Sequence, residues 1–90
     1  MNKRLHAVFH GQVQGIGFRF TAESLAGQLG ISGWVKNLNS GDVEIVAEAG
    51  EKSLKEFLSR INDRFSGTIS DTSVSWLPAT DEFRAFEIRY

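Results

Sequence analysis

Residues 11–19 read Gly11-Gln12-Val13-Gln14-Gly15-Ile16-Gly17-Phe18-Arg19, and they join a predicted strand to a predicted helix. The glycines of this stretch adopt positive φ without steric cost, so that successive amide groups can converge on a ligand. Arg19 falls in the first turn of the predicted helix, where free amides and the helix dipole favour an anion. The stretch therefore predicts a binding loop for a tetrahedral oxyanion such as phosphate.

The hydrophobic period of the sequence changes across this loop. Apolar and polar residues alternate from Leu5 to Val13, which is typical of a strand with one buried face. After the loop, apolar residues recur at helical spacing and Gly30 is placed to end the helix. The apolar positions of this helix are Phe18, Ala22, Leu25, Ala26 and Leu29.

The remaining elements follow from the same patterns. Alternation over 33–38 and again over 43–47, with turn residues 39–42 between them, predicts a β-hairpin with a four-residue loop. A helical stripe runs from Leu54 to Phe65, Ser53 and Glu56 have the spacing of a capping box, and Gly67 is placed to close the helix. A strand that stops at Pro78 and a short strand to residue 90 complete the chain.

The predicted order is β-α-β-β-α-β with a short extra C-terminal strand. This is the order of the α+β, ferredoxin-like split β-α-β sandwich, in which two helices cover one face of an antiparallel sheet. The length of 90 residues predicts a single domain over residues 1–90. Because this architecture carries many activities, function has to be argued from the loop.

Composition narrows the classes of function. The net charge is −1, which predicts neither a nucleic-acid nor a membrane partner, and any anion site must be local. The chain has no cysteine, which excludes disulfides, thiol catalysis and cysteine-based metal sites. No signal peptide or membrane-spanning run is recognisable, so we expect a cytoplasmic protein.

The loop does not match the common nucleotide-binding motifs. It lacks the Gly-Lys-Ser/Thr ending of a Walker loop, and Phe20 stands where Gly-x-Gly-x-x-Gly needs its last glycine. Nucleoside triphosphates and dinucleotides are therefore disfavoured. On spacing alone, a simple glycine-rich turn followed by a solvated arginine remains an equal alternative.

The stretch 11–19 resembles the signature loop of the acylphosphatase family. A second resemblance lies in Gly33-Trp34-Val35-Lys36-Asn37 followed by Gly41-x-Val43-Glu44, and a third in Phe83-x-x-Phe86-Glu87-Ile88-Arg89-Tyr90. Together they cover about residue 5 to residue 90. Ile16 stands where valine is usual, and Asn39-Ser40 replaces the more typical Pro-Asp, a change that we expect to alter loop rigidity rather than chemistry.

The resemblance implies an acylphosphatase, an enzyme that hydrolyses the carboxyl–phosphate bond of acyl phosphates to a carboxylate and inorganic phosphate. It implies no cofactor and no metal, and we expect a monomer. A carboxylate is a good leaving group, so a catalyst can work mainly by positioning and charge stabilisation. By resemblance, Arg19 and Asn37 are the catalytic residues, and Asn37 orients the attacking water. The phosphoryl group is bound by Gln14, Gly15, Ile16, Gly17, Phe18 and Arg19, with the loop amides and the Arg19 guanidinium as donors.

Other polar and aromatic residues receive structural interpretations. His6 and His10 share one strand face about 13 Å apart, too far to chelate one metal directly, so we expect solvated or cross-strand roles. Trp34 and Trp76 are expected to pack.

The acidic pairs are expected on the solvated surface. These are Glu48 with Glu51 and Asp81 with Glu82, and nothing in the sequence brings them to the loop. The C-terminal carboxylate of Tyr90 follows a strand and is an alternative partner for Arg19.

Three other classes of protein share some of these sequence features. An RNA-recognition module shares the order of elements, but the strand at 43–49 carries Glu44 and Glu48 and no aromatic residue. A non-catalytic phosphate-binding module would have no need of both Arg19 and Asn37. The N-terminal part of the hydrogenase-maturation carbamoyltransferase also looks like acylphosphatase, but it continues into cysteine clusters, and we expect a standalone enzyme here.

Overall fold

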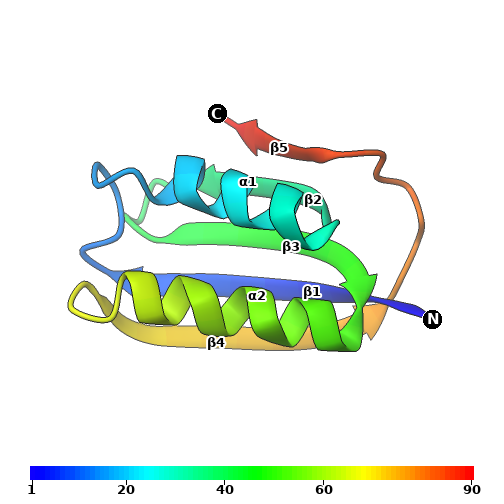
Figure 1. Ribbon diagram of the computed structural model, residues 1–90. Helices are drawn as coiled ribbons and strands as arrows, with labels where there is room; N and C mark the ends of the chain where they lie inside the picture. Colours follow the sequence, from blue (N-terminus) through cyan, green and yellow to red (C-terminus); the bar gives the residue numbers. More distant parts are fainter.

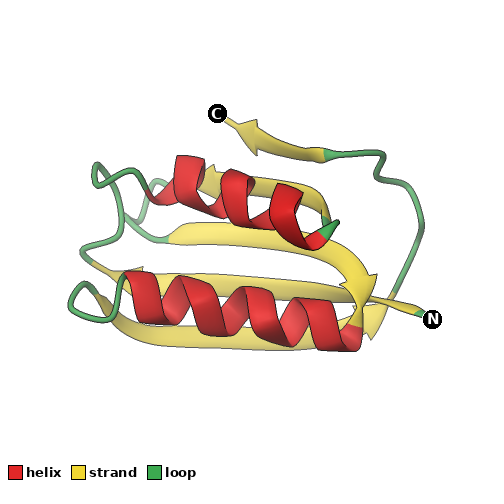
Figure 2. Ribbon diagram, in the orientation of Figure 1, coloured by secondary structure: helices red, strands yellow, loops and turns green.

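The elements of the computed structural model, which describes all of residues 1–90, follow the predicted order (Figures 1 and 2). They are β1 (Asn2–Gly11), α1 (Phe18–Leu29), β2 (Ser32–Asn37), β3 (Val43–Gly50), α2 (Glu51–Arg64), β4 (Ile69–Pro78) and β5 (Phe86–Arg89). Both helices lie over the same face of the sheet (Figure 2). The prediction of a ferredoxin-like α+β sandwich is thus confirmed.

The sheet has the strand order β4-β1-β3-β2-β5. β1 pairs antiparallel with β3 and β4, and β2 pairs antiparallel with β3. The prediction of a wholly antiparallel sheet is wrong at one edge, because β5 runs parallel to β2. The segment 79–85 carries the chain across one end of the sheet, from the β4 edge to the opposite edge, and reverses its direction (Figure 1). Because β2 also runs opposite to β4, β5 enters the sheet parallel to β2.

The core lies between the sheet and the two helices. The predicted alternation of β1 is confirmed, since Leu5, Ala7 and Phe9 are fully buried. The helical stripes are confirmed as well, by the burial of Phe18, Ala22 and Ala26 on α1 and of Leu54, Phe57 and Ile61 on α2. Neither helix is long and apolar enough to cross a membrane.

The helix ends agree with the sequence at α1 and differ at α2. Gly30 ends α1 in the left-handed conformation, with φ 68°. The α2 helix begins at Glu51, directly after Gly50, and no side chain caps it. The predicted capping box of Ser53 and Glu56 is wrong, because both residues already lie inside the helix.

The hairpin between β2 and β3 is closed by Leu38, whose N–H donates to the Asp42 carbonyl over 2.8 Å. The strands end at Asn37 and resume at Val43, so the connection is one residue longer than predicted. Asn37 and Val43 are register partners, which places Asn37 at the mouth of the hairpin.

Glu48 is buried, not solvated as predicted, with 3% of its surface exposed. Its carboxylate accepts hydrogen bonds from Arg4 Nε over 2.7 Å and from the backbone N–H groups of Thr80 and Asp81 over 2.9 Å each. Burial opposes ionisation, but the bonds from Thr80, Arg4 and Asp81 together hold the pKa of Glu48 below its usual value. This carboxylate therefore fastens the crossover segment 79–85 to the sheet.

The other acidic residues predicted at the surface, Glu51, Asp81 and Glu82, do lie there. Glu82 also pairs with Arg4, which lowers the pKa of the Glu82 carboxyl. Hydrogen bonds from Lys3 and Lys55 lower the pKa of Glu51 to about 2.

Candidate active site

A hollow of about 180 Å³ lies where the β1–α1 loop meets the mouth of the β2–β3 hairpin. Arg19 and Asn37 both line it, although they belong to different elements and β3 separates β1 from β2 in the sheet. The loop reaches the hairpin at the end of the sheet and so brings the two predicted residues together. The full lining is Val13, Gly15, Gly17, Phe18, Arg19, Phe20 and Asn37.

The loop backbone leaves amide groups free at the start of α1. Gly15 and Gly17 have φ values of 78° and 80°, which glycine adopts without strain. Gly17 is the N-cap of α1, no side chain caps the helix, and its first turn has no acidic residue. The first-turn N–H groups thus lack side-chain acceptors, and an oxyanion in the hollow would supply them.

Phe18 fixes the loop to the core. Its side chain is 2% exposed, and its ring lies 5.1 Å from the ring of Phe9 and 4.8 Å from that of Phe65. Val13 is fully buried at the other end of the loop. The loop is therefore held by apolar side chains at both ends, while its glycines stay exposed between them.

The side chains of Arg19 and Asn37 have no hydrogen-bond or ion-pair partner in the protein. No carboxylate lies within ion-pair distance of Arg19, whose guanidinium stands 4.9 Å from the ring centre of Tyr90. The alternative of an ion pair between Arg19 and the C-terminal carboxylate is therefore not observed, because the Tyr90 ring occupies that position. No hydrogen bond within the protein engages the side-chain amide of Asn37.

Two predicted binding residues, Gln14 and Ile16, lie outside the lining of the hollow. The Gln14 amide Nε2 donates to the carbonyls of Leu38 and Asp42, over 2.8 and 2.9 Å. The side chain of Ile16 is 41% exposed and does not belong to the hydrophobic core. The prediction that Gln14 and Ile16 bind the phosphoryl group therefore rests on their backbone amides alone.

Phe20 is a lining residue that the sequence reasoning missed. Its side chain is 65% exposed at the rim of the hollow, directly after Arg19. The sequence does indicate that Phe20 is exposed. The apolar stripe of the helix runs from Phe18 to Ala22, so Phe20 does not fall on the buried face.

The histidines have the cross-strand roles expected for them. His6 Nε2 lies 2.7 Å from Glu44, and His10 contacts Asp42 at 3.1 Å and Ser73 at 3.0 Å. No group of His, Cys, Asp or Glu side chains is arranged to hold a metal ion. Trp34 is partly buried under the guanidinium of Arg89, 5.0 Å away.

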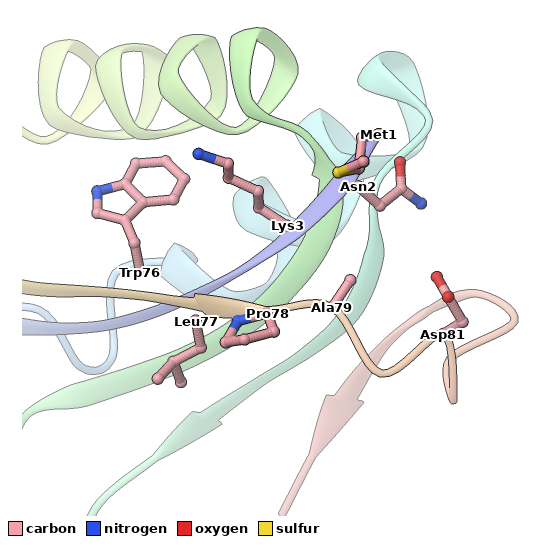
Figure 3. A pocket seen from close by; sticks show the side chains of 8 residues that line it. All are labelled: Met1, Asn2, Lys3, Trp76, Leu77, Pro78, Ala79 and Asp81. Atoms are coloured by element: carbon pink, nitrogen blue, oxygen red, sulfur yellow. The ribbon is translucent and has the colours of Figure 1, made fainter.

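A larger hollow, of about 750 Å³, lies at the opposite end of β1 (Figure 3). The start of β1, the end of β4 and the residues after β4 line it, and Trp76 is 39% exposed in its wall. It contains none of the predicted site residues. The larger of the two hollows is therefore not the candidate active site.

The sheet order, the helices on one face and the loop at a helix N-terminus define a ferredoxin-like protein with a glycine-rich loop between β1 and α1. The family profile of acylphosphatase matches residues 5–88. An acylphosphatase of Clostridium beijerinckii is 36% identical over 88 residues, covering 97% of this chain and 98% of the relative. That of Clostridium acetobutylicum is 42% identical over 82 residues, covering 89% of each chain. The crystal structure of acylphosphatase from Bacillus subtilis matches with a TM-score of 0.90 and 32% identity, covering 98% of this chain and 99% of that one.

The chain belongs to the acylphosphatase family, and it is an enzyme that hydrolyses acyl phosphates. The predictions of family and activity are thus confirmed, and the non-catalytic alternative is not supported. The same fold also occurs within a longer protein. Full-length HypF in a phosphate- and nucleotide-bound form matches with a TM-score of 0.91 and 27% identity, but the match covers 12% of HypF.

Proposed function

We propose that Arg19 and the loop amides from Gln14 to Phe18 bind the phosphoryl group, and that Asn37 orients the attacking water. One observation carries the proposal: Arg19 and Asn37 line the same hollow at an uncapped helix N-terminus, and neither has a polar partner in the protein. A guanidinium fork and convergent N–H groups suit three phosphoryl oxygens, and the helix dipole adds to the attraction.

Asn37 suits the role of a water-positioning residue. Its side-chain amide offers a donor and an acceptor, so it can hold a water without acting as a base. The water oxygen forms a bond to phosphorus, the bond from phosphorus to the acyl oxygen breaks, and its electron pair leaves on the carboxylate. The bound phosphoryl group takes up the proton of the water, which makes the reaction substrate-assisted.

The acyl half of the substrate would extend past the rim. A hollow of about 180 Å³ encloses the phosphoryl end, and the exposed ring of Phe20 borders the way out. We therefore propose that small acyl phosphates are accepted with weak selection for the acyl group. We further propose a monomer of one domain that acts in the cytoplasm without a metal, a cofactor or a nucleic-acid partner.

Removing the Arg19 guanidinium tests phosphoryl binding. We expect Arg19→Ala to lower kcat/KM for benzoyl phosphate by a factor of about 10² or more, because a charge-assisted donor to the transferring group is lost. Inhibition by inorganic phosphate should weaken in parallel. Arg84→Ala is the matched control, since Arg84 is exposed, unpaired and outside the hollow. An Arg19→Ala enzyme with unchanged kcat/KM and phosphate inhibition would show that Arg19 does not bind the phosphoryl group.

A further inference from the structure

The side chain of Gln14 connects the phosphate loop to the hairpin that carries Asn37. We propose that Gln14 is a positioning residue, whose side-chain amide sets the place of Asn37 relative to the bound phosphoryl group. This inference rests on the proposed roles of Asn37 and the loop. It adds a function of the Gln14 side chain to the one proposed for its backbone amide.

The Gln14 side chain binds both ends of the hairpin connection 38–42. Nε2 donates one hydrogen to the carbonyl of Leu38 over 2.8 Å and the other to the carbonyl of Asp42 over 2.9 Å. Leu38 follows Asn37 directly, and Asp42 precedes Val43, the register partner of Asn37. Both donor hydrogens of one amide are thus bound to the residues that flank this pair.

No other hydrogen bond joins residues 12–17 to residues 38–42. The loop backbone bonds elsewhere, with the Gln12 N–H donating to the Thr68 carbonyl over 2.9 Å and the Gly17 carbonyl accepting from Thr21. Gln14 itself is half-buried and directly precedes Gly15, whose positive φ turns the loop toward the hollow. Its side chain is therefore the hydrogen-bonded link between loop residues 12–17 and the hairpin connection that follows Asn37, and His10 at the end of β1 contacts Asp42 separately at 3.1 Å.

The distance between these parts matters for the reaction. In-line attack requires the water to lie close to phosphorus along one direction, and a displacement of about 1 Å can reduce the rate by a factor of about 10². Loss of the two donors would leave the Leu38 and Asp42 carbonyls without this partner and would free the hairpin to move away from the loop. The expected defect is one of turnover, because the donors to phosphate remain in place.

A double-mutant cycle distinguishes an effect of Gln14 on the position of Asn37 from a loss of activity that does not involve Asn37. We expect Gln14→Leu, which keeps much of the side-chain volume but no donor, to lower kcat for benzoyl phosphate by a factor of about 10 to 10². Inhibition by inorganic phosphate should change by a much smaller factor. In an Asn37→Ala background, Gln14→Leu should lower kcat by less than about twofold, because its effect passes through Asn37. Equal losses in both backgrounds, or an unchanged kcat in the single variant, would overturn the proposal.

The pH profile of Gln14→Glu gives a second readout that does not depend on the leucine variant folding. At neutral pH an ionised carboxylate would face two carbonyl oxygens and repel them, whereas a protonated carboxyl can donate one hydrogen bond. We expect the activity of this variant relative to the wild type to rise as the pH falls toward 5. A ratio that stays constant over this range would contradict the positioning role. The Asn37→Ala enzyme alone reports on the proposed function: full activity there would refute the role of Asn37, whatever Gln14 does.

Discussion

Arg19 and Asn37 line one hollow, and neither side chain has a hydrogen-bond or ion-pair partner within the protein. Arg4, by contrast, is held by Glu48, Glu82 and Thr80. Buried and half-buried polar groups in folded proteins usually have partners, so two neighbouring exceptions that share a hollow indicate a place for a ligand. At the level of single residues, the unpaired polar groups of Arg19 and Asn37 identify the candidate site.

Two glycines with positive φ illustrate how different the constraints on single residues are. A Cβ on Gly33, where φ is 140°, would lie 2.0 Å from the Val46 carbonyl oxygen, whereas a Cβ on Gly15 would meet no atom within 4 Å. We expect Gly33→Ala to destabilise the fold by about 3 kcal/mol or more, because β2 must move away from β3. Gly15→Ala should cost about 1–2 kcal/mol, from backbone strain alone.

Urea unfolding of the two alanine variants measures this difference. Equal losses of unfolding free energy would mean that β2 and β3 do not approach as closely at Gly33 as the structure shows. Activity separates the two positions further, since Gly15 lines the hollow and Gly33 does not.

At the scale of elements, the segment 79–85 decides where β5 pairs. This segment crosses the end of the sheet and has no regular structure (Figure 1). The buried Glu48 carboxylate binds its backbone at Thr80 and Asp81 and joins it to Arg4 on β1. One carboxylate of β3 therefore holds the crossover in place and, through it, the strand that ends beside Arg19.

This arrangement predicts a specific dependence of stability on pH. The folded pKa of Glu48 lies below its unfolded value, so its contribution is present above the ordinary carboxyl pKa and is lost as the pH falls through the lowered one. We expect Glu48→Gln to lose about 1–3 kcal/mol of unfolding free energy at neutral pH, because it retains one acceptor oxygen and loses the charge. The difference between wild type and variant should narrow below about pH 5.

Chemical unfolding at several pH values checks this prediction, with Glu56→Gln as the control. Glu56 forms an exposed pair with Arg60 within α2, and such pairs contribute about 0.5 kcal/mol or less. A Glu48→Gln variant as stable as the control at neutral pH would show that the carboxylate does not hold the crossover.

At the scale of the whole molecule, the periodicity of the sequence was sufficient for the order of the elements but not for every pairing. The strand β1 and both ends of α1 follow from local patterns, such as the alternation from Leu5 and the left-handed Gly30. The parallel pairing of β5 and the burial of Glu48 depend on residues far apart in the chain. Glu48, for example, meets Thr80 only after the crossover, and nothing local distinguishes it from Glu44.

The candidate site, like the fold, was predictable only where local sequence patterns determine it. Arg19 and Asn37 could be named because their motifs resemble those of a family, and Gly15 and Gly17 because positive φ has a local signature. The exposure of Phe20 and the bonds of the Gln14 side chain could not be predicted, since they depend on how the loop meets the hairpin.

Asn37 is proposed to orient the water that attacks a phosphoryl group held by Arg19 and the loop, and its replacement by alanine tests this role. The most direct test compares the hydrolysis of benzoyl phosphate by wild type and by folded Asn37→Ala, both in excess EDTA. We expect the wild type to keep its turnover, and kcat of the variant to fall by a factor of about 10² to 10³ while inorganic phosphate still inhibits it. An Asn37→Ala enzyme with the wild-type kcat would refute the water-orienting role of Asn37.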